Sequence, residues 1–248
     1  RVTRRRPLQT AIYWIVYLVV TSAVTFPLTV YQGFLREHAY GLATQGFGSW
    51  MGDQVKGLVI GALLGGLAII VIYGVVRRAP RTWWAWGAGV GIAFLAFTLV
   101  IAPVFLAPMF NTYKPLEDEA VRGPILSLAR ANGIPANDVF VFDASKQTTR
   151  ISANVSGFLG TERISLNDNL LNRASLPEIE AVMAHEIGHY VLNHTWTLLA
   201  GFGLILLAGF AFLYRSFAWC QARWGAAWGV RDAGAVAGLP LAVFLLSI

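Results

Sequence analysis

The sequence predicts a mainly α-helical protein that crosses a membrane several times and carries one small α+β domain. Hydrophobic residues make up 56% of the 248 residues, and the mean hydropathy is +0.58. Only 13% of the residues are charged, about half the share of a soluble domain. Most of the acidic residues lie between residues 108 and 194. This polar stretch separates two apolar regions, so the chain divides into residues 1–107, 108–194 and 195–248.

The first membrane region, residues 1–107, contains three predicted helical spans. They cover residues 11–31, 56–76 and 83–107, and each is long enough to cross a bilayer. Pro27 predicts a kink near the end of the first span. In the second span a glycine recurs every four residues, which lets another helix approach closely. The glycines are Gly57, Gly61 and Gly65.

The polar domain, residues 108–194, predicts short helices and strands. We expect a helix over residues 125–131, which begins near Pro124 because a proline does not fit deep inside a helix. Residues 139–142 predict a buried strand. Residues 150–158 and 163–166 predict two more strands, joined as a hairpin around Gly160.

A longer helix is predicted over residues 176–193. Ser175 and Glu178 form a capping box, and Pro177 fits the first turn. The last membrane region, residues 195–248, then contains a span over residues 195–219 and the start of another over residues 237–248. Because the chain begins with Arg1 and stops inside an apolar run, we expect the natural protein to extend beyond both ends.

Residues 185–189 read His-Glu-Ile-Gly-His and lie well inside this predicted helix. Two histidines four residues apart project from one face and can bind one Zn²⁺ per chain. We therefore predict His185 and His189 as metal ligands. Glu186 is predicted as the catalytic base that takes a proton from a zinc-bound water. The simpler alternative is a helix with incidental polar residues.

A catalytic zinc site needs a third protein ligand, and the chain does not supply an obvious one. One known pattern has a histidine six residues after the second histidine, but that position is Thr195. His194 is one residue out of register, and a plain polar residue at the membrane surface explains it at least as well. No glutamate follows Glu186, and the later acid Asp232 lies in a short loop. We expect the third ligand beyond Ile248.

Composition excludes several other classes of protein. Cys220 is the single cysteine, so an internal disulfide or a multi-thiolate metal site cannot form. The net charge of +6 comes mostly from arginines beside apolar spans, which indicates membrane orientation and no nucleic-acid partner. A transporter or channel is disfavoured because the stretches 11–31, 57–73 and 87–101 contain no charged residue. A non-catalytic membrane scaffold or pseudo-protease stays open, because the third ligand is absent.

Beyond the zinc motif, several stretches resemble the CAAX prenyl protease 1 family of membrane-embedded zinc proteases, and more distantly the HtpX-type proteases. They are residues 26–41, 53–56, 101–111, 115–118, 142–146, 155–157, 163–166 and 185–189. The resemblance implies a zincin-like catalytic domain that faces a chamber walled by membrane helices. It also implies a third zinc ligand, a glutamate in an E-x-x-x-A-D-type motif after the last span.

The resemblance further implies a peptide or protein substrate, membrane-associated or prenylated, that pairs with the strand at Ser152, Ala153 and Asn154. The family usually has Ser-Asn-Ala at these positions, so a side-chain contact from Ala153 is not implied. A multi-pass protein of a bacterial inner membrane is expected, or of the endoplasmic reticulum if the source is eukaryotic. Arginine-rich span ends usually face the cytosol, and this rule predicts a catalytic domain on the other side of the membrane. The resemblance instead implies a catalytic domain that faces the cytosol.

Overall fold

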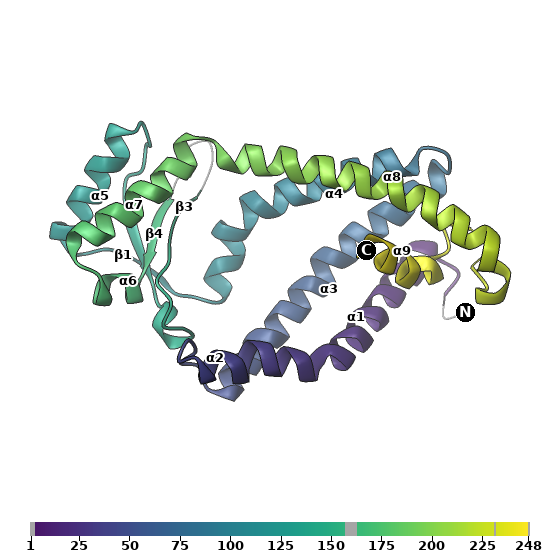
Figure 1. Ribbon diagram of the computed structural model, residues 1–248, viewed down its shortest axis with the longest axis horizontal. Helices are drawn as coiled ribbons and strands as arrows, with labels where there is room; N and C mark the ends of the chain where they lie inside the picture. Colours follow the sequence, from purple (N-terminus) through teal and green to yellow (C-terminus); the bar gives the residue numbers. More distant parts are fainter. Residues whose placement is uncertain (1–2, 157–162, 231, 248) are drawn as a thin grey trace. The chain divides into compact units, whose positions relative to one another are not determined.

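The computed structural model describes residues 3–156, 163–230 and 232–247 (Figure 1). The chain forms two compact units. One contains Arg1–Phe26, Val55–Ala96 and Leu199–Ile248, and the other contains Pro27–Gln54 and Phe97–Leu198.

Apolar helices dominate the chain, as the hydropathy predicts. The long ones are α1 (Arg6–Val30), α3 (Phe47–Arg78), α4 (Trp83–Ile101) and α8 (His194–Trp228), and α9 is a shorter one (Leu239–Leu246). Among the described residues, three helices are long and apolar enough to cross a membrane. They are Arg6–Ala39, Phe47–Arg78 and His194–Trp228, and the apolar helices Trp83–Leu99 and Val236–Leu246 are shorter.

Prolines disturb two of these helices. Pro27 lies inside α1, and four residues later the chain passes through a π-helical turn (Tyr31–Leu35) into α2 (Arg36–Ala39). The predicted span over residues 83–107 is helical too. After α4 it continues as a π-helical turn (Ala102–Leu106) and a 3₁₀ turn (Ala107–Met109) that contain Pro103 and Pro108. A proline has no N–H to donate, so the regular hydrogen-bond ladder changes there.

The first unit is held together by an aromatic and aliphatic core. Its buried residues are Val76, Trp83, Ala88, Phe210, Leu213, Phe217, Cys220, Val230 and Leu245. The predicted glycine stripe on α3 allows close approach of another helix at one end only, at Gly65 among its three glycines. A side chain at Gly65 would meet Trp14 of α1 at 2.5 Å, whereas Gly57 and Gly61 have open space beside them. The Trp14 indole also donates a hydrogen bond to the Ala62 carbonyl at 3.2 Å.

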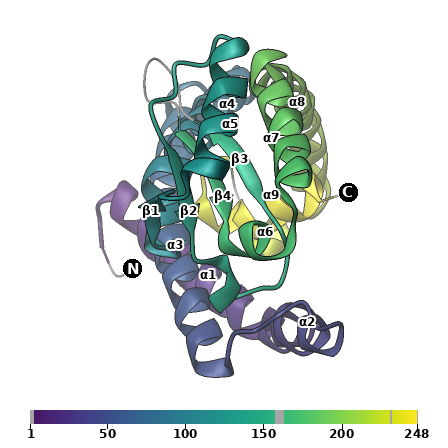
Figure 2. The same cartoon turned by 90° about the vertical axis from the view of Figure 1, so that its left-hand side faces the viewer.

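The second unit contains a four-stranded mixed sheet in the order β1-β2-β4-β3 (Figure 2). The strands are β1 (Tyr113–Pro115), β2 (Val139–Phe142), β3 (Ala153–Ser156) and β4 (Arg163–Asn167). β2 and β4 are parallel, and the other two pairs are antiparallel. The predicted strand over residues 139–142 is confirmed, as is the pairing of the next two strands. The predicted turn around Gly160 lies outside the described residues.

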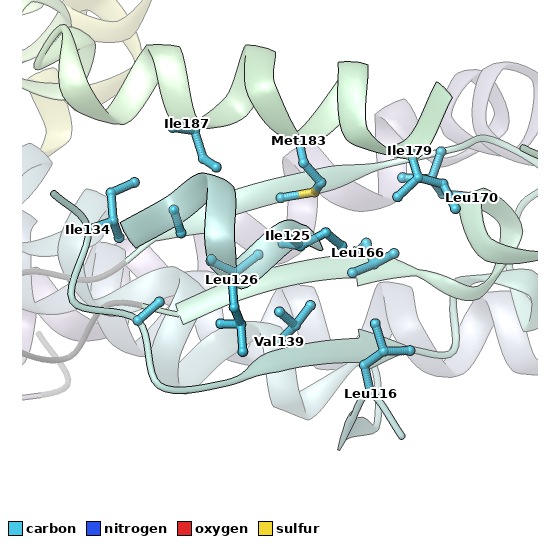
Figure 3. Close-up of a cluster of buried hydrophobic side chains, with 13 residues drawn as sticks. Leu116, Ile125, Leu126, Ile134, Val139, Leu166, Leu170, Ile179, Met183 and Ile187 are labelled. Atoms are coloured by element: carbon cyan, nitrogen blue, oxygen red, sulfur yellow. The ribbon is translucent and has the colours of Figure 1, made fainter. Parts of the chain in front are cut away.

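Three helices accompany this sheet: α5 (Glu119–Ala131), α6 (Asp168–Arg173) and α7 (Leu176–Val191). Figure 3 shows Ile179, Met183 and Ile187 of α7 in the same cluster as Leu166 of β4 and Val139 of β2. All five residues are nearly or fully buried. The helix that carries the histidines is therefore fixed to the sheet by one apolar face.

The expected start of the first of these helices, near Pro124, is wrong. α5 begins at Glu119, and Pro124 lies inside it. The Asp118 carboxylate accepts a hydrogen bond from the Ala120 N–H at 3.0 Å, which caps the helix earlier than the proline suggested. The hydrogen bond lost at Pro124 is offset because the next residue, Ile125, is fully buried in the core.

α7 ends two residues before its predicted end. Its last helical residue is Val191, Leu192 is the C-cap, and Asn193 has a positive φ of 54°. Asparagine tolerates this left-handed conformation better than most residues. Helix α8 begins immediately afterwards at His194, so only Leu192 and Asn193 separate the two helices.

Candidate metal centre

The predicted metal ligands lie on the side of α7 that faces away from its core residues. His185 and His189 each follow a core residue, Met183 or Ile187, by two positions. Two residues correspond to about 200° around a helix, so the histidine stripe is opposite to the buried stripe. Both histidines are exposed, and Glu186 is half-buried between the two faces.

The two imidazoles converge on one another. The Nε2 atoms of His185 and His189 are 2.9 Å apart, and the ring planes meet at 81°. Two nitrogens bound to one tetrahedral zinc at about 2.0–2.1 Å would be about 3.3 Å apart. The pair is within a few tenths of an ångström of that spacing. Two nitrogen lone pairs at this distance need a proton or a cation between them, and a divalent metal ion fits that requirement.

His194 completes a chain of three imidazoles. Its Nδ1 atom lies 2.6 Å from the Nδ1 atom of His189. In a continuous helix, a residue five positions on would be rotated by about 140° from His189 and could not reach it. The left-handed turn at Asn193 removes that obstacle. The sequence interpretation of His194 as a surface residue missed this contact, because it assumed that the helix continued to residue 193.

The contact defines the protonation of His189 if its Nε2 binds a metal. The remaining proton is then on Nδ1, and the Nδ1–H donates to the Nδ1 lone pair of His194. Histidines that bind metals commonly donate their second N–H in this way, which fixes the ring and its tautomer.

In the part of the chain that the structure describes, no third ligand lies around the pair. Across residues 3–156, 163–230 and 232–247, no group of three histidine, cysteine, aspartate or glutamate side chains is placed to hold a metal ion. Asp232 lies in the first unit, where it lines an open cavity with Arg6 and Arg77. Among the described residues, the candidate metal centre thus comprises the two histidines, His194 beside them and the adjacent Glu186.

The predicted substrate-binding residues Ser152, Ala153 and Asn154 lie at and just before the start of β3, which is an edge strand of the sheet. The Asn167 N–H donates to the Ser152 carbonyl at 2.9 Å, so Ser152 bonds toward β4. In an antiparallel pair this direction alternates. The backbone groups of Ala153 and Val155 therefore point to the open edge.

The side chains of this strand alternate as well. Ala153 and Val155 pack against the hydrophobic core, which leaves the Ala153 side chain no part in binding a substrate. Asn154 is on the opposite face, and its Oδ1 is a buried atom without a hydrogen-bond partner among the described residues. A buried amide oxygen without a donor is costly, so a ligand or a water that donates to it would be favourable.

Charges near the sheet stabilise its geometry away from the metal centre. The Arg122 guanidinium donates to Asp138 at 2.9 Å and to Glu119 at 2.7 Å. The hydrogen bond from Arg122 lowers the pKa of Asp138 below its usual value of 3.8. This pair joins α5 to the residue that precedes β2.

Apolar helices, a small mixed sheet and a helix with two histidines one turn apart are together typical of the membrane-bound metalloproteases. Comparison with known proteins specifies the family. Residues 2–112 match the family described as CAAX prenyl protease N-terminal, five membrane helices, and residues 115–246 match peptidase family M48. The chain belongs to the M48 peptidases of the CAAX prenyl protease 1 type, and it is a multi-pass membrane protein.

Individual relatives agree with this assignment. An uncharacterized metalloprotease of Bacillus subtilis, YhfN, is 32% identical over 98% of this chain and 57% of its own length. CAAX prenyl protease 1 of Saccharomyces cerevisiae is 35% identical over 71% of this chain and 39% of its own. The crystal structure of S. mikatae Ste24p matches with a TM-score of 0.73 at 30% identity, over 80% of this chain and 47% of that one. The chain spans about half the length of these relatives.

Proposed function

We propose that this chain carries the catalytic centre of a membrane-embedded zinc endopeptidase that hydrolyses peptide bonds. The observation that supports this most is the convergence of the His185 and His189 Nε2 atoms at 2.9 Å on the exposed side of a core-anchored helix. Family membership in the M48 peptidases supports the same chemistry.

The residues have separate roles in this proposal. His185 and His189 hold the metal ion through Nε2. A bound zinc ion supplies Lewis acidity that activates a water molecule and polarises the scissile carbonyl. Glu186 accepts the proton of the attacking water and passes a proton to the leaving amine nitrogen. His194 accepts the hydrogen bond from His189 Nδ1–H and keeps that imidazole in the metal-binding orientation.

The third ligand is proposed to be a glutamate that lies outside residues 1–248. Three protein ligands and one open position are usual at a catalytic zinc. With two histidines the site is too weakly coordinated to retain zinc against competing chelators, so the proposal requires this additional group.

A substrate peptide is proposed to pair with β3 along its open edge. The backbone N–H and C=O of Ala153 and Val155 supply the hydrogen bonds of an added strand. Asn154 gains a donor for its partnerless Oδ1 from the substrate or from an ordered water. The Ser152 backbone is hydrogen-bonded to Asn167 through both its N–H and its carbonyl. Its role in this proposal is therefore to hold β3 in register with β4.

The substrate class is proposed as a peptide or protein in or near the bilayer. Relatives of this chain are called CAAX prenyl proteases, and a prenylated C-terminal peptide is therefore one candidate. The Bacillus relative supports a bacterial inner membrane as the location.

Metal analysis combined with proteolysis tests the proposal. The full-length natural protein, purified in detergent, is expected to contain one zinc per chain and to cleave an unstructured membrane-associated peptide. Glu186→Gln should keep the zinc and lose at least 100-fold in kcat, roughly the lower range of general-base contributions. His185→Ala should lose zinc and activity together. Zinc-free wild-type protein with full activity would overturn the proposal.

A non-catalytic scaffold is the second candidate, favoured by the absence of a third ligand among the described residues. It predicts that full-length protein binds zinc weakly or not at all. It also predicts that Glu186→Gln has no effect on any peptide cleavage in the preparation.

A further inference from the structure

The first unit contains an open cavity of about 260 Å³ where helix ends meet. Arg6 from the start of α1 and Arg77 from the end of α3 line it, together with Asp232 of the loop before α9. The cavity lies at the polar end of an apolar helix, because Arg77 and Arg78 are in the last turn of α3, and no charged residue lies between Lys56 and Arg77. The polar end of a membrane-length helix is where lipid headgroups are expected to lie.

Arg77 is held in place by neutral partners. Its Nε donates to the Gly234 carbonyl at 3.1 Å, and its terminal amino group donates to the Thr10 hydroxyl at 3.0 Å. Thr10 is fully buried. A guanidinium has several further N–H donors, so these two bonds orient the group toward the cavity without neutralising its charge.

The cavity lining carries a net positive charge, since Arg6 and Arg77 outnumber Asp232. Four more arginines lie close in sequence to these lining residues, namely Arg4, Arg5, Arg78 and Arg81. Basic pockets between membrane helices bind the phosphate groups of lipids. The charge therefore favours an anionic ligand.

A second, apolar cavity of about 140 Å³ adjoins the first. The two share Val76, Trp83 and Ala233 in their linings. The walls of the second cavity continue with aliphatic and aromatic side chains of α3, α8 and α9. A basic compartment that opens into an apolar one matches a ligand with an anionic head and a hydrocarbon tail.

We propose that this double cavity binds an anionic phospholipid, with the phosphate between Arg6 and Arg77 and part of one acyl chain in the apolar compartment. Inorganic phosphate would satisfy the arginines alone and leave the apolar compartment unused. A zwitterionic lipid would fill the apolar part and bring a cation next to Arg6. The anionic phospholipid satisfies both parts.

Lipid titration followed by native mass spectrometry tests this site on the detergent-purified protein. Phosphatidylglycerol is expected to bind at one saturable site, at least tenfold more tightly than phosphatidylcholine. Arg6→Gln should weaken phosphatidylglycerol binding about fivefold, since one arginine near an anionic lipid contributes about that factor. The double variant with Arg77→Gln should lose about 25-fold. Arg81→Gln is the matched control: it removes the same charge from an exposed residue outside the lining and should change the affinity less than twofold.

Each alternative gives a distinct result. Equal loss in Arg6→Gln and Arg81→Gln would mean diffuse surface attraction and would overturn the site. Inorganic phosphate that competes with the lipid at equal concentration would indicate a plain anion site. Equal binding of the two lipids would show that the apolar compartment acts alone. Arg6 is exposed, so its variant remains informative if the Arg77 variant does not fold.

Discussion

The Nδ1 atoms of His189 and His194 lie 2.6 Å apart although the residues are five positions apart on consecutive helices. The left-handed residue between the helices makes this contact possible. The hydrogen bond supports one of the two histidines of the metal centre and leaves the other, His185, without an equivalent support from this turn.

Removing His194 is expected to weaken metal binding. Loss of a supporting hydrogen bond to a metal-bound histidine costs 10- to 100-fold in affinity as an order of magnitude. His194→Ala should show this loss in a competition titration with a zinc chelator, and in a changed visible spectrum of the Co²⁺-substituted protein. His194→Asn provides the control, because the asparagine carbonyl can accept the same hydrogen bond and should restore most of the affinity. If both variants bind zinc like the wild type, His194 is only a surface residue.

The turn at Asn193 is expected to tolerate glycine and to reject a β-branched residue. Its φ is 54°, a region that costs an ordinary L-residue about 1–2 kcal/mol. Asn193→Val should therefore lower the thermal stability in detergent and weaken zinc binding together. Asn193→Gly should preserve both. Equal zinc affinity in the two variants would show that the conformation of this turn does not affect zinc binding.

The attachment of α7 to the sheet depends on its buried face. Ile187→Ala is expected to destabilise the second unit by about 2–5 kcal/mol, because the residue is 2% exposed and its removal leaves a cavity. Ala181→Gln at an exposed position of the same helix should change the stability by no more than about 0.5 kcal/mol. Thermal melts of the metal-free proteins measure both. Similar melting temperatures for the two variants would contradict the packing described for α7.

The pair Arg122–Asp138 predicts how stability depends on acid. The folded pKa of Asp138 is lower than its unfolded value, so the pair stabilises the fold fully above the unfolded pKa. This stabilisation is lost as the pH falls below about 4 toward the folded pKa. Asp138→Asn should lower stability at pH 7 and flatten the dependence between pH 5 and 3. Arg122→Gln should have the same effect. If both variants keep the wild-type dependence of stability on pH, the Arg122–Asp138 pair is not the source of that dependence.

Parts of this fold could be read from local signals. Val139–Phe142 is a short apolar run of branched and aromatic residues, and it forms a strand. Ser175 and Glu178 predict the start of α7, where the Ser175 N–H donates to the Glu178 carboxylate at 2.7 Å. These signals act within a few residues, so tertiary contacts are not needed to recognise them.

Other parts depend on contacts that no short pattern contains. β1 is three residues that end in a proline, and it is a strand only because it pairs with β2. The π-helical turns follow from long helices that pass prolines. A local signal was missed in one place: Asn167 accepts a hydrogen bond from the Leu170 N–H and caps α6. His185, Glu186 and His189 were singled out from the sequence and stay a predicted metal site, whereas the approach of His194 to His189 depends on the turn geometry.

The open edge of β3 also has a bearing on aggregation. A strand edge that can pair with a peptide can equally pair with the edge of a second molecule, and proteins commonly limit this by keeping edge strands short. Within the described residues β3 has four residues, of which Ala153 and Val155 present backbone groups outward. So few hydrogen bonds cannot hold two copies together. A peptide that is also held at a metal centre needs no more than these few hydrogen bonds. The shortness of the strand therefore favours transient pairing with a peptide over pairing between two copies of the protein.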